Sequence, residues 1–476
     1  MRTASFVALA VLVAGVYRSA ESTLLPAVEA SPGLLSSPIN LSEAVSAELG
    51  AALDKGVVRS RVIGLDVRRL PNPAAVSSGA AEASIALDLF PDVAIKAIFE
   101  RFDSNSTGVT WVGHVEGVGG STVTLVYGDR LMHGSVIMPS GTFQIRPAPE
   151  DVRDANRPPL GELHVVSQVD QGALPREAEP LMPSFSEAEI AAARDVAKSD
   201  IGDVIDVMIV YTPTAEQAVG GAAAMTNLIN LGLSETNTSY ANSDVRQRVR
   251  LVHSALVNYT ESSEFATTLT ALRAGGVPGV ASLREQYRAD LVMMLIHPAR
   301  PDACGIAYIQ ASVTAAFQSS AFSVTDTSCV SPGLTMAHEW GHNMGAQHDW
   351  YVSASVLPYS YAHGHVNTRS GQRWRTIMSY NDICAAQGFA CTRLLAWANP
   401  DTRLNPLCTA GNVTCRGTLW NLPGEGTGIA AGTRSNCSIG VLTANECDAD
   451  DHRALNNTAL NVANFRQSLI AGSAAR

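Results

Sequence analysis

The chain has 476 residues, which is long for one average domain and predicts two or three folded units. Hydrophobic residues make up 46% and charged residues 16% of the chain, a composition typical of folded proteins and not of disordered ones. The formal net charge of -11 argues against a nucleic-acid-binding surface, which requires clustered lysine and arginine.

Residues 1–20 have the features of a signal peptide. Arg2 gives a positively charged start, and residues 4–16 form an uninterrupted apolar run that is short for a bilayer span. Small residues permit cleavage after Gly15, whereas cleavage after Ala20 would place Arg18 where a small residue is preferred. An uncleaved anchor is the alternative interpretation. No later stretch is apolar enough to cross a membrane, so we expect a secreted protein whose mature form has no transmembrane segment.

Residues 21–200 are expected to form a first unit, separate from the C-terminal part of the chain. The first part alternates apolar and polar residues between glycine and Asp-Arg turns, which predicts a small β-rich domain. Residues 147–200 are rich in proline and predict an exposed linker, with a short acidic helix at 186–198. The strand-like runs are residues 83–89, 109–115, 122–127 and 134–138.

A second unit is expected over residues 201–476. Residues 204–211 are almost wholly apolar and β-branched, which predicts a strand buried on both faces. Thr214 and Gln217 are spaced as in a capping box and predict a helix through about Leu233. Strands alternate with helices, which favours an α/β unit with a mainly parallel sheet. Further strands are expected at 249–257 and 289–296, and further helices at 267–274, 280–287 and 451–469.

All eight cysteines lie in the second unit, beginning with Cys304. An even number of cysteines in an exported chain favours disulfides formed in an oxidising compartment. Sequential pairing would close four short loops, but the sequence leaves the connectivity open. A second zinc site is the competing interpretation, and the lack of any CxxC pair disfavours it.

The segment from His338 to His348 carries the strongest chemical signal. His338 and His342 are four residues apart, so on a helix both imidazoles lie on one face and can bind one ion. Glu339 follows the first histidine and can reach a water at that ion. Gly345 can adopt a positive φ and turn the chain back, so that His348 supplies a third ligand. Three protein ligands leave one tetrahedral position open, as in catalytic zinc sites.

This string resembles the metzincin motif HExxHxxGxxH of zinc proteases. Residues 376–380, with Met378, resemble the Met-turn that lies beneath the metal in that family. His348 followed by an aspartate is similar to the reprolysin (M12B) branch, and residues 361–365 together with a Met-turn ending in tyrosine resemble the peptidyl-Asp metalloendopeptidase group. The resemblance covers most of residues 203–470. It implies one catalytic Zn2+ and an α+β fold, with a twisted mixed sheet, long helices and a zinc cleft between upper and lower subdomains.

Two features depart from the reprolysin pattern. Reprolysin propeptides often hold the zinc inactive with a cysteine thiolate, but no cysteine precedes Cys304. The resemblance implies that residues 21–200 are a propeptide, which is therefore expected to inhibit through another ligand, such as an aspartate or a histidine, or by occlusion. Tyr380 stands two residues after Met378, as in astacins and serralysins, which implies a role in zinc ligation or in the transition state. A buried tyrosine with a paired hydroxyl is the alternative.

The resemblance also implies a mechanism and a substrate-binding edge. Zinc lowers the pKa of bound water to about 7, and Glu339 is expected to act as the general base. An extended protein or peptide substrate is expected to lie antiparallel along an edge strand, bound through its backbone. The expected edge-strand residues are Gly305, Ile306, Ala307 and Tyr308.

Other polar residues near the motif have weaker signals. Arg373 and Arg375 could receive an acidic side chain of the substrate, as the peptidyl-Asp resemblance implies, and a solvated pair is the alternative. His363 and His365 are more simply explained as loop histidines than as ligands.

Two other classes of function stay open at this stage. One is a secreted binding or adhesion protein that keeps the fold without catalysis, although the intact Glu339 and histidines disfavour it. The other is a zinc hydrolase of non-peptide esters or amides, which the edge-strand residues disfavour. We expect the protein to be made as a zymogen and to be a monomer. The sequence leaves a structural Ca2+ undecided.

Overall fold

The protein is described here by a computed structural model. Within the described residues, no helix is long and apolar enough to cross a membrane. The expected signal peptide, residues 1–20, lies outside them, as do Cys408 and Cys415. The described residues are 34–35, 56–66, 69–70, 76, 84–104, 108–149, 163–194, 200–369, 373–402, 427–430, 432 and 437–470.

The N-terminal sheet has eight strands in the order β1-β8-β7-β6-β5-β4-β3-β2, and every pairing is antiparallel. It confirms the expected β-rich region. The last strand, β8, corrects one detail, because it lies within residues 147–200, which the proline content had assigned to an exposed linker. The strands are β1 (Val57–Gly64), β2 (Ser84–Phe90), β3 (Val93–Ser104), β4 (Gly108–Val115), β5 (Thr122–Gly128), β6 (Leu131–Met138), β7 (Gly141–Pro147) and β8 (Leu163–Val169).

The C-terminal unit, residues 200–470, contains a five-stranded sheet in the order β10-β9-β11-β13-β12. Its first four strands run parallel, β9, β11 and β13 are mostly buried, and only the edge strand β12 is antiparallel to its neighbour. The predicted mixed, mainly parallel sheet is therefore confirmed. The strands are β9 (Val204–Tyr211), β10 (Arg248–Leu256), β11 (Leu291–Ile296), β12 (Gly305–Ala307) and β13 (Phe322–Asp326).

Helices cover this sheet, and two of them differ from the sequence predictions. The helix predicted to begin at Thr214 is two helices, because Gly220 has a φ of 97° and ends the first, whose N-cap is Thr212. The last helix ends at Val462, and Leu469, at the end of the predicted helix, is 67% exposed. The helices are α4 (Glu187–Arg194), α5 (Pro213–Val219), α6 (Ala222–Asn242), α7 (Phe265–Arg273), α8 (Val280–Tyr287), α9 (Thr327–Val330), α10 (Thr335–Asn343), α11 (Asp382–Ala385) and α12 (Asp451–Val462).

Short elements and disulfides complete the C-terminal unit. Strands β14 (Val366–Asn367), β15 (Trp374–Arg375) and β16 (Thr392–Arg393) form a small sheet after the zinc-binding motif. The 3-10 helices η3 (Ala315–Ser320) and η5 (Leu442–Glu446) belong to this unit, and η2 (Gln171–Ala173) precedes it. The disulfides among the described cysteines pair sequential residues: Cys304–Cys329, Cys384–Cys391 and Cys437–Cys447.

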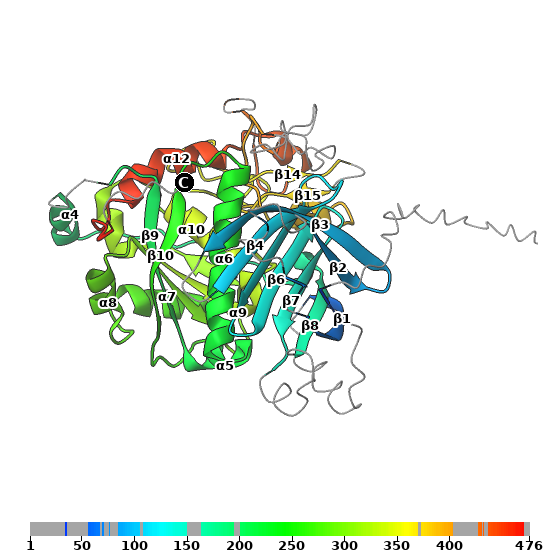
Figure 1. The fold of residues 1–476 in the computed structure, drawn as a ribbon. Helices are drawn as coiled ribbons and strands as arrows, with labels where there is room; N and C mark the ends of the chain where they lie inside the picture. Colours follow the sequence, from blue (N-terminus) through cyan, green and yellow to red (C-terminus); the bar gives the residue numbers. More distant parts are fainter. Residues whose placement is uncertain are drawn as a thin grey trace, which may run out of the picture.

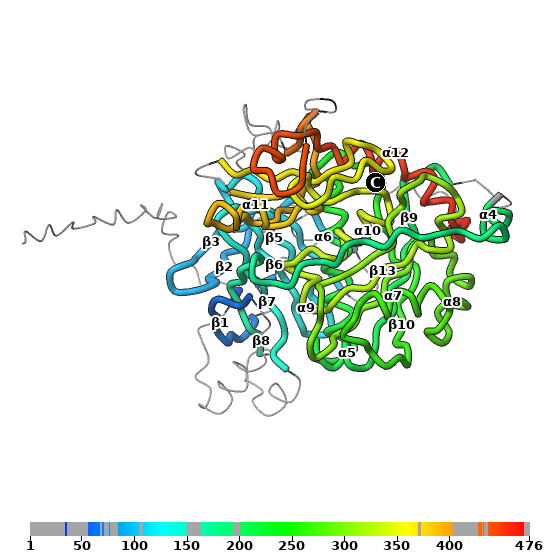
Figure 2. The backbone as a smooth tube through the Cα atoms, turned by 180° about the vertical axis from the view of Figure 1, so that it is seen from behind, coloured from blue at the N-terminus to red at the C-terminus, as the bar shows by residue number. Residues whose placement is uncertain are grey.

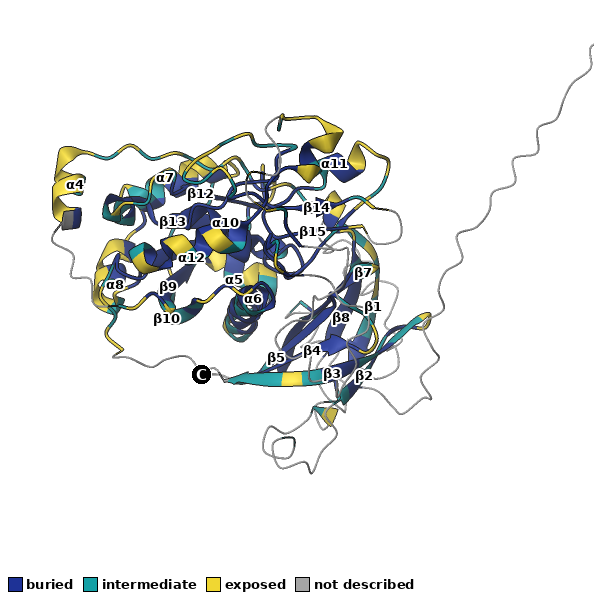
Figure 3. Cartoon of the chain, turned by 90° about the horizontal axis from the view of Figure 1, so that it is seen from above, coloured by how far each residue is buried: buried dark blue, intermediate teal, exposed yellow. Residues whose placement is uncertain are grey.

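Helix α6 joins the two halves of the molecule. The N-terminal sheet, blue and cyan in Figure 1, stands against this long green helix, and the remainder of the C-terminal unit lies on its other side. Glu235 of α6 is buried in this contact, where its Oε1 accepts hydrogen bonds from Ser135 (2.6 Å) and Ser331 (2.7 Å). Figure 3 shows that most of both sheets is buried, whereas α4 is largely exposed.

The chain crosses the C-terminal unit between β8 and α4. In Figure 2 this stretch is a teal-green tube that runs over the face of the molecule and ends at α4. We call residues 171–181 the cleft segment. It extends along the edge strand β12, and this places it beside the zinc-binding motif.

Candidate metal centre

Three histidine rings converge at one point of the structure. His338 and His342 lie on α10 and point to the same side, and the Nε2 atom of His348 lies 3.2 Å from the first and 3.0 Å from the second Nε2. All three side chains are buried. Nitrogen ligands at about 2.0–2.1 Å from a tetrahedral zinc would stand about 3.3 Å apart, so these atoms have the spacing of a zinc site.

A glycine turn brings the third histidine to the other two. Gly345 has a φ of +88°, and the Ala346 N–H donates to the Gly341 carbonyl (2.9 Å), which reverses the chain after α10. A Cβ at Gly345 would lie 2.8 Å from a side-chain carbon of Pro358, so conformation and space both require glycine there.

Backbone carbonyls fix the orientation of two of the rings. The Nδ1 of His338 lies 2.9 Å from the Ile377 carbonyl, and the Nδ1 of His342 lies 2.9 Å from the Ala346 carbonyl. A carbonyl can only accept, so Nδ1 carries the proton and Nε2 keeps a free lone pair for a metal. Burial lowers the pKa of His338 to about 3, which keeps that ring neutral and suited to ligation.

Glu339 lies beside the histidines in an unusual state. It is completely buried, and neither carboxylate oxygen has a hydrogen-bond partner among the described residues. Burial raises its pKa well above the ordinary value, the charge of Glu177 adds to this, and Arg393 opposes it. A Cβ at Gly305 would lie 2.5 Å from Glu339 Oε1, so glycine is needed where β12 passes this carboxylate. Such an orphaned carboxylate fits a partner held at the three imidazoles.

The turn after β15 packs against α10 and the loop that carries His348. Met378 packs so closely under α10 that a Cβ at Gly341 would lie 2.6 Å from its sulfur. Asp349, which follows the third histidine, accepts a hydrogen bond from the Tyr380 N–H (2.9 Å) and thus ties the turn to the histidine loop. The residues expected to form a Met-turn therefore pack against α10 and are tied to the histidine loop.

Tyr380 stands directly against the histidines. Its ring centroid is 4.3 Å from that of His348 and 5.9 Å from that of His338. Its hydroxyl donates to the backbone carbonyl of Glu177 (2.7 Å). The tyrosine thus faces the metal centre, but its hydroxyl bonds to the cleft segment.

The cleft segment occupies the edge at which a substrate was expected. The backbone carbonyl of Arg176 accepts a hydrogen bond from the Cys304 N–H (3.0 Å), and the Ala178 N–H donates to the Gly305 carbonyl (2.8 Å). Further along, the Leu181 N–H donates to the Ala307 carbonyl (2.9 Å). The bridge at Leu181 is parallel to the edge, whereas the direction expected for a substrate is antiparallel.

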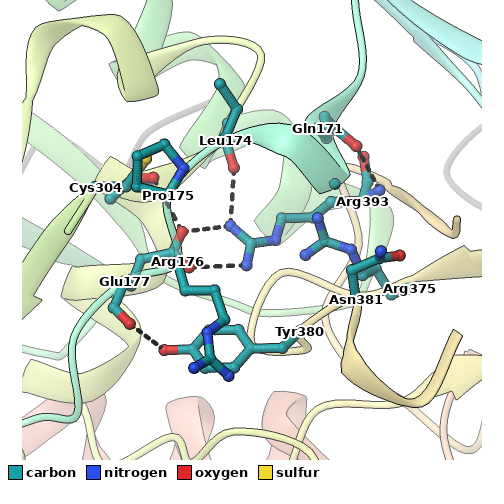
Figure 4. Close-up of a pocket in the computed structure, with 13 residues that line it drawn as sticks. Gln171, Leu174, Pro175, Arg176, Glu177, Cys304, Arg375, Tyr380, Asn381 and Arg393 are labelled. Atoms are coloured by element: carbon teal, nitrogen blue, oxygen red, sulfur yellow. Dashed lines mark hydrogen bonds and ion pairs between the residues drawn. The ribbon is translucent and has the colours of Figure 1, made fainter. Parts of the chain in front are cut away.

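An acidic side chain of the cleft segment is held in a pocket next to the metal centre. The carboxylate of Glu177 forms two ion-pair hydrogen bonds with Arg393, one of them of 3.1 Å, and accepts a third from Thr335 (3.0 Å). Both charged side chains are only 4% exposed. Burial disfavours ionisation of Glu177, but the charge and the hydrogen bonds of Arg393 outweigh it and hold the pKa of Glu177 well below the ordinary value. Figure 4 shows this pair in the pocket, with Tyr380 alongside.

Sequence reasoning had not singled out this pair. It named Arg373 and Arg375 for an acidic group, yet Arg373 stacks on Phe389 at 3.6 Å, and Arg375 bonds to the carbonyls of Cys391 (3.0 Å) and Ser379 (2.6 Å). The sequence does contain an indication for Arg393, since a lone cation at the start of an apolar run must be buried with a partner.

The two loop histidines after the motif and the expected edge-strand residues are packed inside the fold. His363 lies between the carbonyls of His348 (2.6 Å) and Ser355 (2.8 Å) and stacks on Trp350. His365 is buried, and its backbone N–H donates to the Thr376 hydroxyl. The four expected edge-strand residues are buried, and three of them form β12.

Comparisons with known proteins agree with this geometry. Residues 202–406 match the family described as metallo-peptidase family M12B, reprolysin-like. The chain is 32% identical over 296 residues to a peptidyl-Asp metalloendopeptidase of Stenotrophomonas maltophilia strain R551-3, which covers 60% of this chain and 64% of that protein, just under two thirds. It is 28% identical to the protein of that name in strain K279a (73% of this chain, 71% of that protein) and 29% identical to the one in Xanthomonas campestris pv. campestris (75% of each). The resemblance that the motifs indicated is confirmed.

Proposed function

We propose that this chain, with its reprolysin-like metallopeptidase region, is a secreted zinc metalloendopeptidase made as an inactive precursor. One observation carries the proposal: three imidazole nitrogens converge beside an unpaired buried carboxylate, next to an edge strand that already binds a peptide segment. His338, His342 and His348 would hold the zinc.

The residues around the metal have distinct tasks in peptide hydrolysis. When bound, the ion supplies a Lewis acid that polarises the peptide carbonyl and lowers the pKa of water. Glu339 accepts the proton of the attacking water and delivers it to the departing amine. Its burial without other partners leaves both oxygens available for these transfers. Tyr380 faces the same point and can donate a hydrogen bond to the oxygen that becomes negative.

The edge strand supplies binding that does not depend on most of the substrate sequence. The carbonyls of Gly305 and Ala307 and the N–H groups of Cys304 and Ile309 all bond to the cleft segment, so they face outward from the sheet. An extended substrate can use the same groups once the segment has left. This geometry supports cleavage within chains.

The relatives suggest the substrate class. Their name, peptidyl-Asp metalloendopeptidase, leads us to propose that this enzyme also acts on peptide bonds at an aspartate. The N-terminal sheet and the cleft segment would then be the propeptide, and residues 1–20 the export signal.

A single substitution tests the proposed function. Glu339→Ala in the processed enzyme should abolish cleavage of casein or of aspartate-containing peptides, while metal analysis still finds one zinc per chain. Glu285→Gln, on the exposed face of α8 in the C-terminal unit, is the control on a carboxylate remote from the site and should leave the activity of the processed enzyme unchanged. Full activity of the Glu339 variant, or cleavage unaffected by a chelator, would disprove the assignment.

A further inference from the structure

We infer that Arg393 is the residue that selects an acidic side chain of the substrate, and that Glu177 occupies the same pocket in the precursor as a built-in competitor. This inference rests on the proposed function, and it adds the specificity-determining residue and the means of regulation.

The pocket is built from elements that flank the metal centre. Thr335 is the first residue of α10, three residues before the first histidine, and Arg393 ends the strand that follows the Met-turn. Glu177 lies with its backbone carbonyl on the Tyr380 hydroxyl and its carboxylate on these two side chains. A residue whose backbone passes the metal therefore places its side chain in this pocket.

The bonding of Arg393 makes the pocket selective for an anion. Its other hydrogen bonds go to the backbone carbonyls of Gly333 (2.9 Å) and Ser379 (3.1 Å). In the described part of the chain, Glu177 is the one acid that bonds the guanidinium. Arg393 is 4% exposed while Glu177 is in place, and when Glu177 leaves, this cation loses its counter-charge and favours a new carboxylate over a neutral group.

The cleft segment and a substrate exclude one another. The segment uses the outward backbone groups of β12 as well as the anion pocket, so both sets of contacts must be vacated before a peptide can bind. It runs parallel to β12, the reverse of the direction expected for a substrate. The reversed backbone lets Glu177 fill the acid pocket while the segment is not presented for cleavage as a substrate would be.

The competitor role is tested on the full-length precursor, in a Glu339→Ala background that prevents self-cleavage. Glu177→Gln removes the charge and keeps the shape, and Glu187→Gln is the matched control on exposed α4. Hydrogen exchange at the amides of Ala178 and Leu181 should accelerate by about tenfold or more in the first variant and stay unchanged in the second. Unchanged protection in the Glu177 variant would overturn the role of Glu177.

The selectivity role is tested on the processed enzyme with pairs of peptides that differ only in aspartate against asparagine. Arg393→Gln should lower the ratio of the two kcat/KM values by about 100-fold, and Arg393→Lys, which keeps the charge, by less. An unchanged ratio in a folded Arg393→Gln variant would overturn the assignment. If the wild-type enzyme cleaves no peptide at all, the proposed function fails, whereas the exchange experiment still decides whether Glu177 anchors the segment.

Discussion

Glu235 should make the contact between the N-terminal sheet and α6 sensitive to pH. Burial raises the pKa of this carboxyl to about 7 from an ordinary 4.5, although hydrogen bonds from Ser135 and Ser331 oppose the rise. Its Oε2 has no hydrogen-bond partner among the described residues, so the ionised form is poorly compensated. The folded full-length chain therefore holds this proton more tightly than the unfolded or separated chain does.

The direction and size of the effect follow from proton linkage. Below about pH 4.5 the carboxyl is protonated in both states and contributes no pH dependence. Between pH 4.5 and about 7 the separated chain loses the proton and the folded precursor keeps it, so stability falls as pH rises. The difference of about 2.5 pKa units corresponds to about 3 kcal/mol, which is fully lost above about pH 7.

The assay is urea unfolding of the precursor at several pH values from 4 to 8, in the Glu339→Ala background. Glu235→Gln cannot ionise, so wild type should lose about 3 kcal/mol relative to this variant as pH rises through the interval. Glu187→Gln should follow the wild-type profile, because that side chain is exposed. A wild-type profile that stays parallel to that of Glu235→Gln from pH 4.5 to 7 would refute the reasoning.

Three further predictions concern the C-terminal unit. Gly345→Ala should destabilise the protein by about 1–3 kcal/mol and lower zinc content at equilibrium, because alanine strains the turn that delivers the third histidine; unchanged zinc affinity by metal titration would contradict this. Replacing Cys304 and Cys329 by alanine opens a loop with a sequence separation of 25 and should cost about 3.5 kcal/mol in denaturant unfolding, and a cost near zero would argue against a stabilising bridge. Tyr380→Phe should lower kcat by about tenfold or more with KM and zinc content little changed, and an equal kcat would return the tyrosine to a purely structural role.

The zinc-binding motif could be predicted from sequence because its geometry is local. The helical repeat puts His338 and His342 on one face, and the glycine turn needs only the residues between Gly345 and His348. The buried strand β9 was likewise predicted at its observed bounds, since eight nearly apolar residues between polar ones leave little ambiguity.

The acid pocket could not be predicted, because its parts meet only in the fold. Glu177 and Arg393 are 216 residues apart, and nothing in either neighbourhood names the other. The nearer arginines, Arg373 and Arg375, were plausible from their position before the Met-turn, but the small sheet commits one to stacking and the other to backbone carbonyls. The split of the helix at Gly220 was missed for a different reason, since a consecutive glycine pair offers a left-handed cap that the capping-box pattern concealed.

The two attachments of the N-terminal region bear on how the precursor would become active. A cut near exposed α4 would leave the cleft segment covalently joined to the N-terminal sheet, which binds α6 independently. Two linked contacts dissociate more slowly than either alone, because the second holds the first at high effective concentration. Cleavage alone would thus leave Glu177 in its pocket, and loss of the sheet contact becomes the step that frees it. Ionisation of Glu235 weakens that contact as pH rises, so we expect the Glu235→Gln precursor, once cut, to stay inhibited for longer at pH 7.5 than wild type. If the cut wild-type and Glu235→Gln precursors gain activity at equal rates, the sheet contact does not control the release of the cleft segment.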